Sequence, residues 1–275
     1  MSITVTLLGT GNPLPDPSRA GAATLVEAGG KRMLVDAGRG VCMRLAGAGV
    51  LPLMLDGVFL THLHSDHICD LNDVVTTRWV MSPAPSPLRL FGPPGTREMV
   101  DAMLAMLAAD VRYRMAHHAD LEWGPGVEVS EVGPGEVLDV DGVRVVAGAT
   151  DHRPVEPSVG YRFEHEGHAV VIAGDTVPCA GLDELCSGAN MYVQTVLRED
   201  LVRMVPMQRF QETVDYHSTL EQTAATAQRA GVTTLVLTHQ IPTPAPNASE
   251  EWLSIVRSGF EGTIVFGEDM LQVST

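Results

Sequence analysis

The sequence has few cysteines, few basic residues and no long uninterrupted apolar run. Its four cysteines, Cys42, Cys69, Cys179 and Cys186, form no CxxC pair, so we predict free thiols in a reducing compartment rather than a disulfide framework. Apolar runs are too short to span a bilayer, and the first residues lack the basic and apolar regions of a signal peptide. We therefore expect a cytoplasmic protein with no membrane partner.

Basic residues are scarce relative to acidic ones. The chain has 18 Lys and Arg against 34 Asp and Glu, which gives a formal net charge of -16. A field of this sign repels polyanions at long range unless a local basic groove overrides it. The charge therefore disfavours RNA and DNA as partners and favours a smaller substrate.

The pattern of apolar residues predicts one mixed α/β domain over residues 1–275, without repeats or a linker. Strands are predicted at 3–9, 22–27, 32–36, 57–61, 88–91, 127–132, 136–140, 143–149, 158–164, 168–174, 190–195, 233–238 and 263–266. Helices are predicted at about 39–48, 67–80, 95–108, 218–230 and 249–257. Because strand-rich stretches and alternating stretches are both present, we expect two mixed sheets packed face to face with helices outside.

A dense cluster of ionisable side chains follows the predicted strand at 57–61. The segment His62-Leu63-His64-Ser65-Asp66-His67 supplies three imidazoles and one carboxylate within six residues. These donors suit zinc, or iron and manganese at similar sites. A solvated His-rich turn is the alternative, but it gives no reason for an aspartate among the histidines.

Three further predicted strands lead to a residue that can bind a metal. The pairs are 143–149 with Asp151 and His152, 168–174 with Asp175, and 233–238 with His239. Each is ambiguous alone, since a lone histidine more often forms a cap and Asp175 could form an Asx turn. Because residues after neighbouring strands gather at one edge of a sheet, the coincidence predicts a shared metal site.

Several motifs together resemble the metallo-β-lactamase superfamily, and within it the ribonuclease Z and arylsulfatase-like branch. They are LLGTGNPLP near the start, LVDAG at 34–38, FLTHLHSDH at 59–67, GYRF at 160–163, AGDT at 173–176, YHST at 216–219 and LTHQ at 237–240. The similarity extends over nearly the whole chain. It implies a four-layer αββα sandwich of two mixed sheets, a dinuclear metal site and a homodimer.

The resemblance also implies a role for each residue of the cluster. One zinc ion would be bound by His62, His64 and His152, the other by Asp66, His67 and His239, with Asp175 bridging both. Asp36 would hold a ligand in place. Asp66 would also accept a hydrogen bond from the attacking water, and His217 matches the family histidine that assists proton transfer.

Three departures from ribonuclease Z bear on the substrate. In the strand after its Gly-Asp-Thr motif that family carries a His-Glu pair, whereas this chain reads Tyr192-Val193-Gln194-Thr195-Val196, so the support of His217 is altered. Too few residues lie between His152 and Asp175 for the long arm that grips tRNA. The segment 196–216 forms either a substrate-facing or dimer-facing loop, or a surface helix with a Met-rich inner face.

The remaining candidates have structural interpretations. Gly9-Thr10-Gly11-Asn12-Pro13 lacks a nucleotide-binding fingerprint, so we predict a tight turn beneath the site and no nucleotide cofactor. Cys69 is expected to be a small buried core residue. The histidines expected at the surface are His117, His118, His165 and His168. The methionines of 95–108 are expected to form core packing or a lid.

We therefore predict a dinuclear zinc-dependent hydrolase that cleaves a phosphodiester or sulfate ester of a small substrate, with a lactone as a further option. Ribonuclease Z itself, acting on precursor tRNA, ranks second because of the missing arm and the acidic charge. The residues also permit an iron-dependent redox member of the superfamily, such as a thiol dioxygenase, or a metal-binding protein without catalysis.

Overall fold

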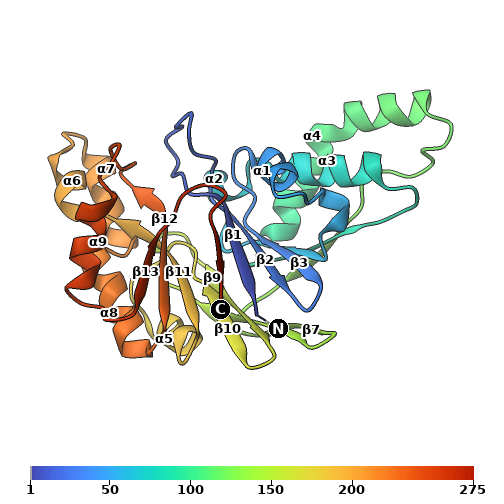
Figure 1. Ribbon diagram of the computed structural model, residues 1–275. Coiled ribbons are helices and arrows are strands. Elements are labelled where there is room, and N and C mark those ends of the chain that lie inside the picture. Colours follow the sequence, from blue (N-terminus) through green and yellow to red (C-terminus); the bar gives the residue numbers. More distant parts are fainter. Residues whose placement is uncertain (1) are drawn as a thin grey trace.

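The computed structural model describes residues 2–275. Two seven-stranded sheets pack against each other and carry helices on their outer faces (Figure 1). This arrangement confirms the predicted four-layer αββα sandwich. That all of the chain forms a single domain stays a prediction.

The first sheet combines an antiparallel and a parallel half. Its strands, in spatial order, are β14 (Gln272–Ser274), β1 (Thr4–Gly9), β2 (Ala23–Ala28), β3 (Lys31–Val35), β4 (Gly57–Phe59), β5 (Leu88–Gly92) and β6 (Val127–Glu131). Pairing is antiparallel from β14 to β3 and parallel from β3 to β6. The carboxyl ends of β3 and β4 therefore lie at the same edge.

The second sheet is mixed in the same way. Its spatial order is β13 (Thr263–Phe266), β12 (Thr234–Ile241), β11 (Met191–Leu197), β10 (His168–Ile172), β9 (Val159–His165), β8 (Val143–Ala149) and β7 (Gly135–Val140). Pairing is parallel from β13 to β10 and antiparallel from β10 to β7. Because β9 is antiparallel to both neighbours, β8 and β10 also end at one edge.

Helices cover the outer face of each sheet. The first sheet carries α1 (Val41–Gly47), α2 (Ser65–Ile68), α3 (Leu71–Met81) and α4 (Thr96–His117), and the second carries α5 (Ala180–Cys186), α8 (Leu220–Ala230) and α9 (Ser249–Arg257). Between β11 and α8 lie α6 (Glu199–Met204), α7 (Gln208–Gln211) and the 3-10 turn η2 (Glu212–Tyr216), and η1 (Pro52–Met54) precedes β4. Among residues 2–275, none of the helices combines the length and apolar character needed to cross a bilayer.

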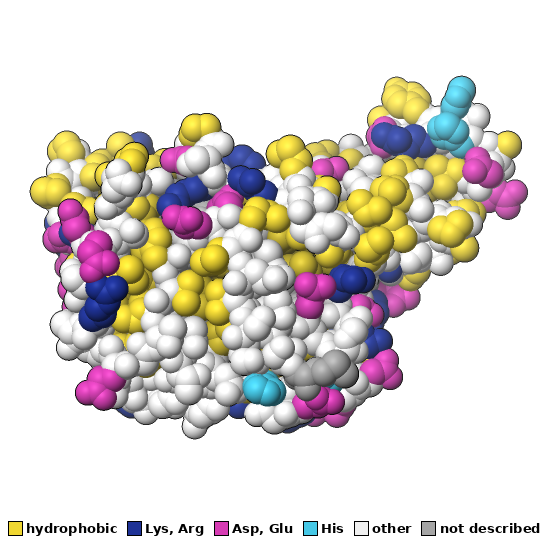
Figure 2. All heavy atoms as spheres, in the orientation of Figure 1, with side chains coloured by type: hydrophobic (Ala, Val, Ile, Leu, Met, Phe, Trp, Pro, Cys, Tyr) yellow, Lys and Arg dark blue, Asp and Glu magenta, His cyan; other side chains and the backbone are white. Residues whose placement is uncertain are grey.

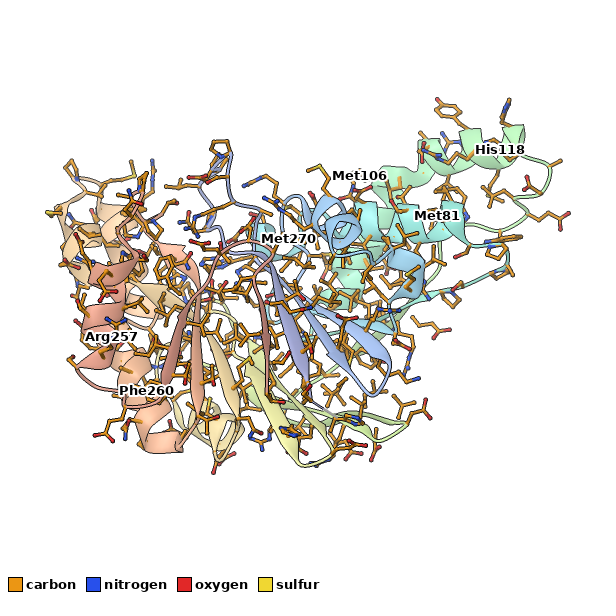
Figure 3. The ribbon with its side chains drawn as sticks, viewed as in Figure 1. Met81, Met106, His118, Arg257, Phe260 and Met270 are labelled. Atoms are coloured by element: carbon orange, nitrogen blue, oxygen red, sulfur yellow. The ribbon has the colours of Figure 1, made fainter. Side chains whose placement is uncertain are left out.

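Helix α4 extends beyond the sheet that it covers. It ends at His117 rather than near the predicted 108, and Figure 3 shows His118 at the far end of this projection. Met99 and Met103 pack against the outer core of the first sheet, as predicted, whereas Met106 is 66% exposed. Packing therefore accounts for only the first half of the helix.

Most predicted elements are present, with three kinds of difference. The predicted helix 67–80 is split into α2 and α3. The short elements β14 and α5 were not predicted, because segments of three and seven residues carry too little periodicity, whereas α6 and α7 lie within 196–216, where a surface helix was one alternative. The strand predicted to end at 238 continues to Ile241.

The space between the sheets is filled by side chains from both. Phe59 stacks on Phe91 with ring centroids 4.7 Å apart, and it meets Tyr161 and Phe163 of β9 edge-on at 5.4 and 5.6 Å. All four side chains are buried. Phe59 therefore joins the two sheets directly above the strand end that leads to His62.

We predict that Phe59→Ala destabilises the protein by about 3–5 kcal/mol, because it removes a fully buried ring and leaves a cavity. Urea unfolding followed by circular dichroism measures this free energy. The matched control, Met43→Ala, alters a side chain that is 76% exposed and should change stability by less than about 0.5 kcal/mol. Equal effects of the two substitutions would contradict the packing described for Phe59.

Candidate metal centre and active site

The predicted site residues meet where the two sheets end at a common edge. Asp36 follows β3, and the segment containing His62 follows β4. The hydroxyl of Tyr161 donates to the carbonyl of Leu60 over 2.8 Å, and the amide of Val159 donates to the carbonyl of Thr61 over 2.9 Å. These bonds fix the position of the first sheet's loop on the second sheet.

A first group of possible ligand atoms consists of His62, His64, His152 and Asp175, all within 4.8 Å of one another. The hydroxyl of Thr61 donates to Asp36, so it accepts from Nδ1 of His62 at 3.0 Å. Nδ1 of His152 donates to the carbonyl of Tyr216 at 2.8 Å. Both rings therefore present an unprotonated Nε2 towards the group.

The imidazoles of this group cannot satisfy one another. Nδ1 of His64 lies 3.1 Å from Nε2 of His62 and 3.2 Å from Nε2 of His152. A proton on Nδ1 of His64 can form a hydrogen bond to only one of the two facing nitrogens, whereas a metal cation would accept a lone pair from each of the three nitrogens. Burial lowers the pKa of His152 to about 4, which keeps this ring in the neutral form that binds metals.

A second group consists of Asp66, His67 and His239, again within 4.8 Å. Nδ1 of His67 donates to Asp36 over 2.7 Å, while its buried Nε2 has no hydrogen-bond partner among residues 2–275. A carboxylate that holds one ring nitrogen and leaves the other free is the arrangement found around metal-binding histidines. Burial would raise the pKa of Asp66, but the hydrogen bond from His239 brings it to about 2.

Asp175 lies between the two groups. Its Oδ2 is 3.9 Å from Nε2 of His62 in the first group and 3.4 Å from Nε2 of His67 in the second. Burial alone would raise the pKa of Asp175, but the facing His239 and His67 hold it well below its usual range. The carboxylate is therefore ionised, and its position allows it to act as a ligand in both groups.

The donor set fits two divalent cations. One group offers three imidazole nitrogens, the other offers two imidazole nitrogens and a carboxylate, and Asp175 lies between them. Among residues 2–275, Nε2 of His67 and Nδ1 of His239 have no hydrogen-bond partner. Nitrogen and oxygen donors in this mixture suit zinc, iron or manganese. The structure thus brings all seven predicted ligands together; their roles in binding stay proposals.

His217 lies beside the two groups and in neither of them. Its Nε2 is 3.2 Å from Oδ2 of Asp175, and its Nδ1 faces the carbonyl of Thr213 at 2.8 Å. The imidazole is therefore held between the centre and the η2 turn, and its part in proton transfer stays a proposal.

His239 reaches the site through an irregularity in β12. The register against β11 shifts between Thr195 and Leu197, and His239 has a φ of 46°. Such a left-handed conformation is uncommon for a residue other than glycine, and a bulge re-directs a side chain. The ligand therefore lies within the strand, whereas the sequence pattern predicts it just after the strand's end.

One residue at the centre was not predicted to act there. The hydroxyl of Thr195 donates to Oδ1 of Asp175 over 2.7 Å, from the strand in which the related enzymes are expected to carry a His-Glu pair. It thereby fixes the oxygen of Asp175 that does not face the histidines. The polar pair Gln194 and Thr195 inside the apolar strand β11 was the available sequence signal.

A pocket of about 240 Å³ opens over the centre. It is lined by Asn12, Pro13, Leu14, His64, Asp66, Asp175, Met207, Arg209, Phe210, Thr213, Tyr216, His217 and Ile241. The turn predicted beneath the site is thus part of a wall. Within 196–216, the residues that line it are Met207, Arg209, Phe210, Thr213 and Tyr216.

Two sequence predictions about other residues are wrong. His165 is buried rather than at the surface, with Nδ1 donating to the carbonyl of Gly142 over 2.9 Å. Cys69 is exposed rather than in the core, because it follows the short helix α2 at the surface. His117 and His118 are exposed, as predicted.

A protein-family model described as the β-lactamase superfamily domain matches residues 31–240. The chain belongs to the metallo-β-lactamase superfamily. It is 53% identical over 273 residues to a protein named ribonuclease Z from Mycolicibacterium paratuberculosis, with 98% of each chain covered. This likeness places it in the ribonuclease Z branch, and it is accordingly a metallo-hydrolase acting on ester bonds, as predicted.

Solved structures of this superfamily share the fold. The metallo-β-lactamase fold protein YhfI from Bacillus subtilis superposes with a TM-score of 0.78 at 20% identity, covering 100% of this chain and 99% of that one. The short form of human tRNase Z superposes with a TM-score of 0.71 at 22% identity and 98% coverage of each chain. The order of layers described above is therefore that of the superfamily.

We predict that Asp36→Asn weakens metal binding about 10- to 100-fold, because it removes the charge that orients His67. Metal content after dialysis against a graded chelator, measured by elemental analysis, tests this. His64→Ala removes a ligand and should lose metal outright, whereas the control Asp139→Asn, on exposed strand β7, should retain it. An unchanged affinity in Asp36→Asn together with a full complement in His64→Ala would count against the site.

Proposed function

We propose that this chain is a ribonuclease Z, a dinuclear zinc-dependent endonuclease that hydrolyses a phosphodiester bond at the 3' side of precursor tRNA. The observation that carries the proposal is the pair of ligand groups sharing Asp175, with His217 beside them and an open pocket above. The relatives named ribonuclease Z support the substrate. From the sequence alone a small ester ranked above tRNA as the substrate, and the proposal reverses that ranking.

Each group at the site has a task in such a hydrolysis. Two divalent ions held there would lower the pKa of bound water and polarise a phosphoryl oxygen. Asp66 accepts a hydrogen bond from the attacking water, and His217 gives its proton to the departing 3' oxygen. The bond between phosphorus and that oxygen breaks, which leaves a 3' hydroxyl on one product and a 5' phosphate on the other.

Zinc is the proposed metal because all seven donors are imidazole nitrogens or carboxylate oxygens. Manganese or iron also suits this set. Elemental analysis of protein purified without added metal separates the options. A preponderance of iron would favour the redox alternative over hydrolysis.

A small phosphodiester is the second candidate, and two observations favour it. Residues 153–174 are largely taken up by the β9–β10 hairpin, which leaves no room for a protruding arm. Figure 2 shows acidic side chains spread over this face of the molecule and basic ones only in small groups. One cation is nevertheless placed for a phosphate, since Arg209 lines the pocket and makes no ion pair within residues 2–275.

The two candidates are separated by comparing three substrates with the zinc-loaded protein. These are a precursor tRNA with a 3' trailer, bis-p-nitrophenyl phosphate and p-nitrophenyl sulfate. Cleavage of the precursor at one position after the acceptor stem supports the proposal. Hydrolysis of a small ester with an intact precursor would contradict it.

A homodimer and a cytoplasmic location are also proposed. The four cysteines are all unpaired, which agrees with a reducing compartment. Light scattering of the purified protein measures the oligomeric state. A monomer at micromolar concentration would contradict the dimer.

We predict that His217→Ala lowers the turnover of precursor tRNA by about 100-fold or more, because the departing oxygen loses its proton donor. Metal content should stay at the wild-type level, since His217 belongs to neither ligand group. His118→Ala, at the exposed end of α4, is the matched control and should retain both properties. Unchanged turnover in His217→Ala would remove the assigned role.

A further inference from the structure

Much of the lining of the pocket is apolar. It includes Leu14, Met207, Phe210, Tyr216 and Ile241. A phosphate alone gains nothing from such a surface, because burying apolar side chains against an anion leaves the anion poorly solvated. The pocket therefore fits a substrate whose phosphate is attached to a flat, largely apolar group.

The aromatic side chains that line the pocket, Phe210 and Tyr216, are held in place by packing. Phe210 packs against the small cluster of Leu197, Val202 and Ile241. The ring of Tyr216 lies 4.8 Å from that of His217 and 5.3 Å from that of His152. Fixed aromatic rings bind nucleobases by stacking with little loss of entropy.

The position of the pocket indicates which side of the substrate it holds. His217 lines the pocket next to Tyr216, and His217 is the residue that donates a proton to the departing oxygen. The group nearest to His217 must therefore be the one that carries this oxygen. Under the proposed reaction that group is the nucleoside which keeps the 3' hydroxyl.

We propose that this pocket binds the base of the nucleotide whose 3' oxygen departs, with Phe210 as its stacking partner. The inference rests on the proposed function and names a subsite of the same centre. Binding of the base would hold the 3' oxygen next to His217 when the bond to phosphorus breaks. Arg209 at the rim lies where a further phosphate of the same strand could contact it.

Adenosine 3'-monophosphate tests the subsite, because it places a base on the oxygen that would depart. Its affinity for the zinc-loaded protein is measured by isothermal titration calorimetry beside two reference ligands. The first is 1,2-dideoxyribose 3-phosphate, which lacks the base, and the second is adenosine 5'-monophosphate, which has its base on the opposite side of the phosphate. We expect adenosine 3'-monophosphate to bind about tenfold more tightly than the abasic compound.

Phe210→Ala should lower the affinity for adenosine 3'-monophosphate about tenfold and leave the affinities for the other two ligands unchanged. Phe210→Tyr keeps the ring and should retain wild-type affinity, which excludes a general effect on folding. Met204→Ala is the control, since this side chain is 71% exposed and lies outside the pocket.

Several results would overturn the subsite. The first is equal affinity of the wild-type protein for adenosine 3'-monophosphate and for the abasic ligand. The second is a loss of affinity in Phe210→Ala that is as large for the abasic ligand as for adenosine 3'-monophosphate. The third is a loss of affinity in this variant that is larger for adenosine 5'-monophosphate than for adenosine 3'-monophosphate. These results are separate from failure of the proposed function, which appears as an uncleaved precursor tRNA. Cleavage of the precursor without dependence on the base would reject the subsite alone.

Discussion

The buried carboxylate of Asp175 is the group on which the arrangement of the site depends. The residue is 3% exposed, and its Oδ2 lies within 3.9 Å of a ring nitrogen on five histidines. Burying so many polar groups is costly unless each is paired, and the protein alone leaves Nε2 of His67 without a partner. Cations bound by the two ligand groups would accept the lone pairs of the ring nitrogens. Metal binding and the stability of the sheet edge that carries the site are therefore coupled.

The backbone around this carboxylate is left-handed at Asp36, where such a conformation is uncommon, and at Gly174, where only a glycine fits. Asp36 has a φ of 61° and still accepts hydrogen bonds from Thr61 and His67. Gly174, with a φ of 68°, approaches Thr61 so closely that a Cβ would lie 2.7 Å from the Cβ of that residue. Such conformations persist where several contacts determine them together. The same contacts align the ligands on both sheets.

The sequence predicted those features that depend on local spacing. The ligands from His62 to His67 are adjacent in the chain, and Asp175 follows a strand directly, so both were found. Thr195 was missed because its role comes from the pairing of β10 with β11, which brings its hydroxyl to Asp175. The burial of His165 likewise depends on a distant loop. A substrate-facing loop was one of the alternatives for 196–216, but the pocket itself was not predicted, because residues 12–14 and 207–216 line it together only in the tertiary fold.

The two walls of the pocket differ in how firmly they are attached. The wall at residues 12–14 is tied to β12, since the side-chain Nδ2 of Asn12 donates to the carbonyl of Gln240 over 2.8 Å. The opposite wall comes from residues 207–216, in α7 and η2, over a small cluster whose buried residues are Leu197, Val202 and Ile241. Loops on a rigid scaffold are where recognition usually varies. The seven candidate ligands, which lie at the common edge of the two sheets, can therefore stay fixed while changes in the segment 207–216 alter which substrate reaches them.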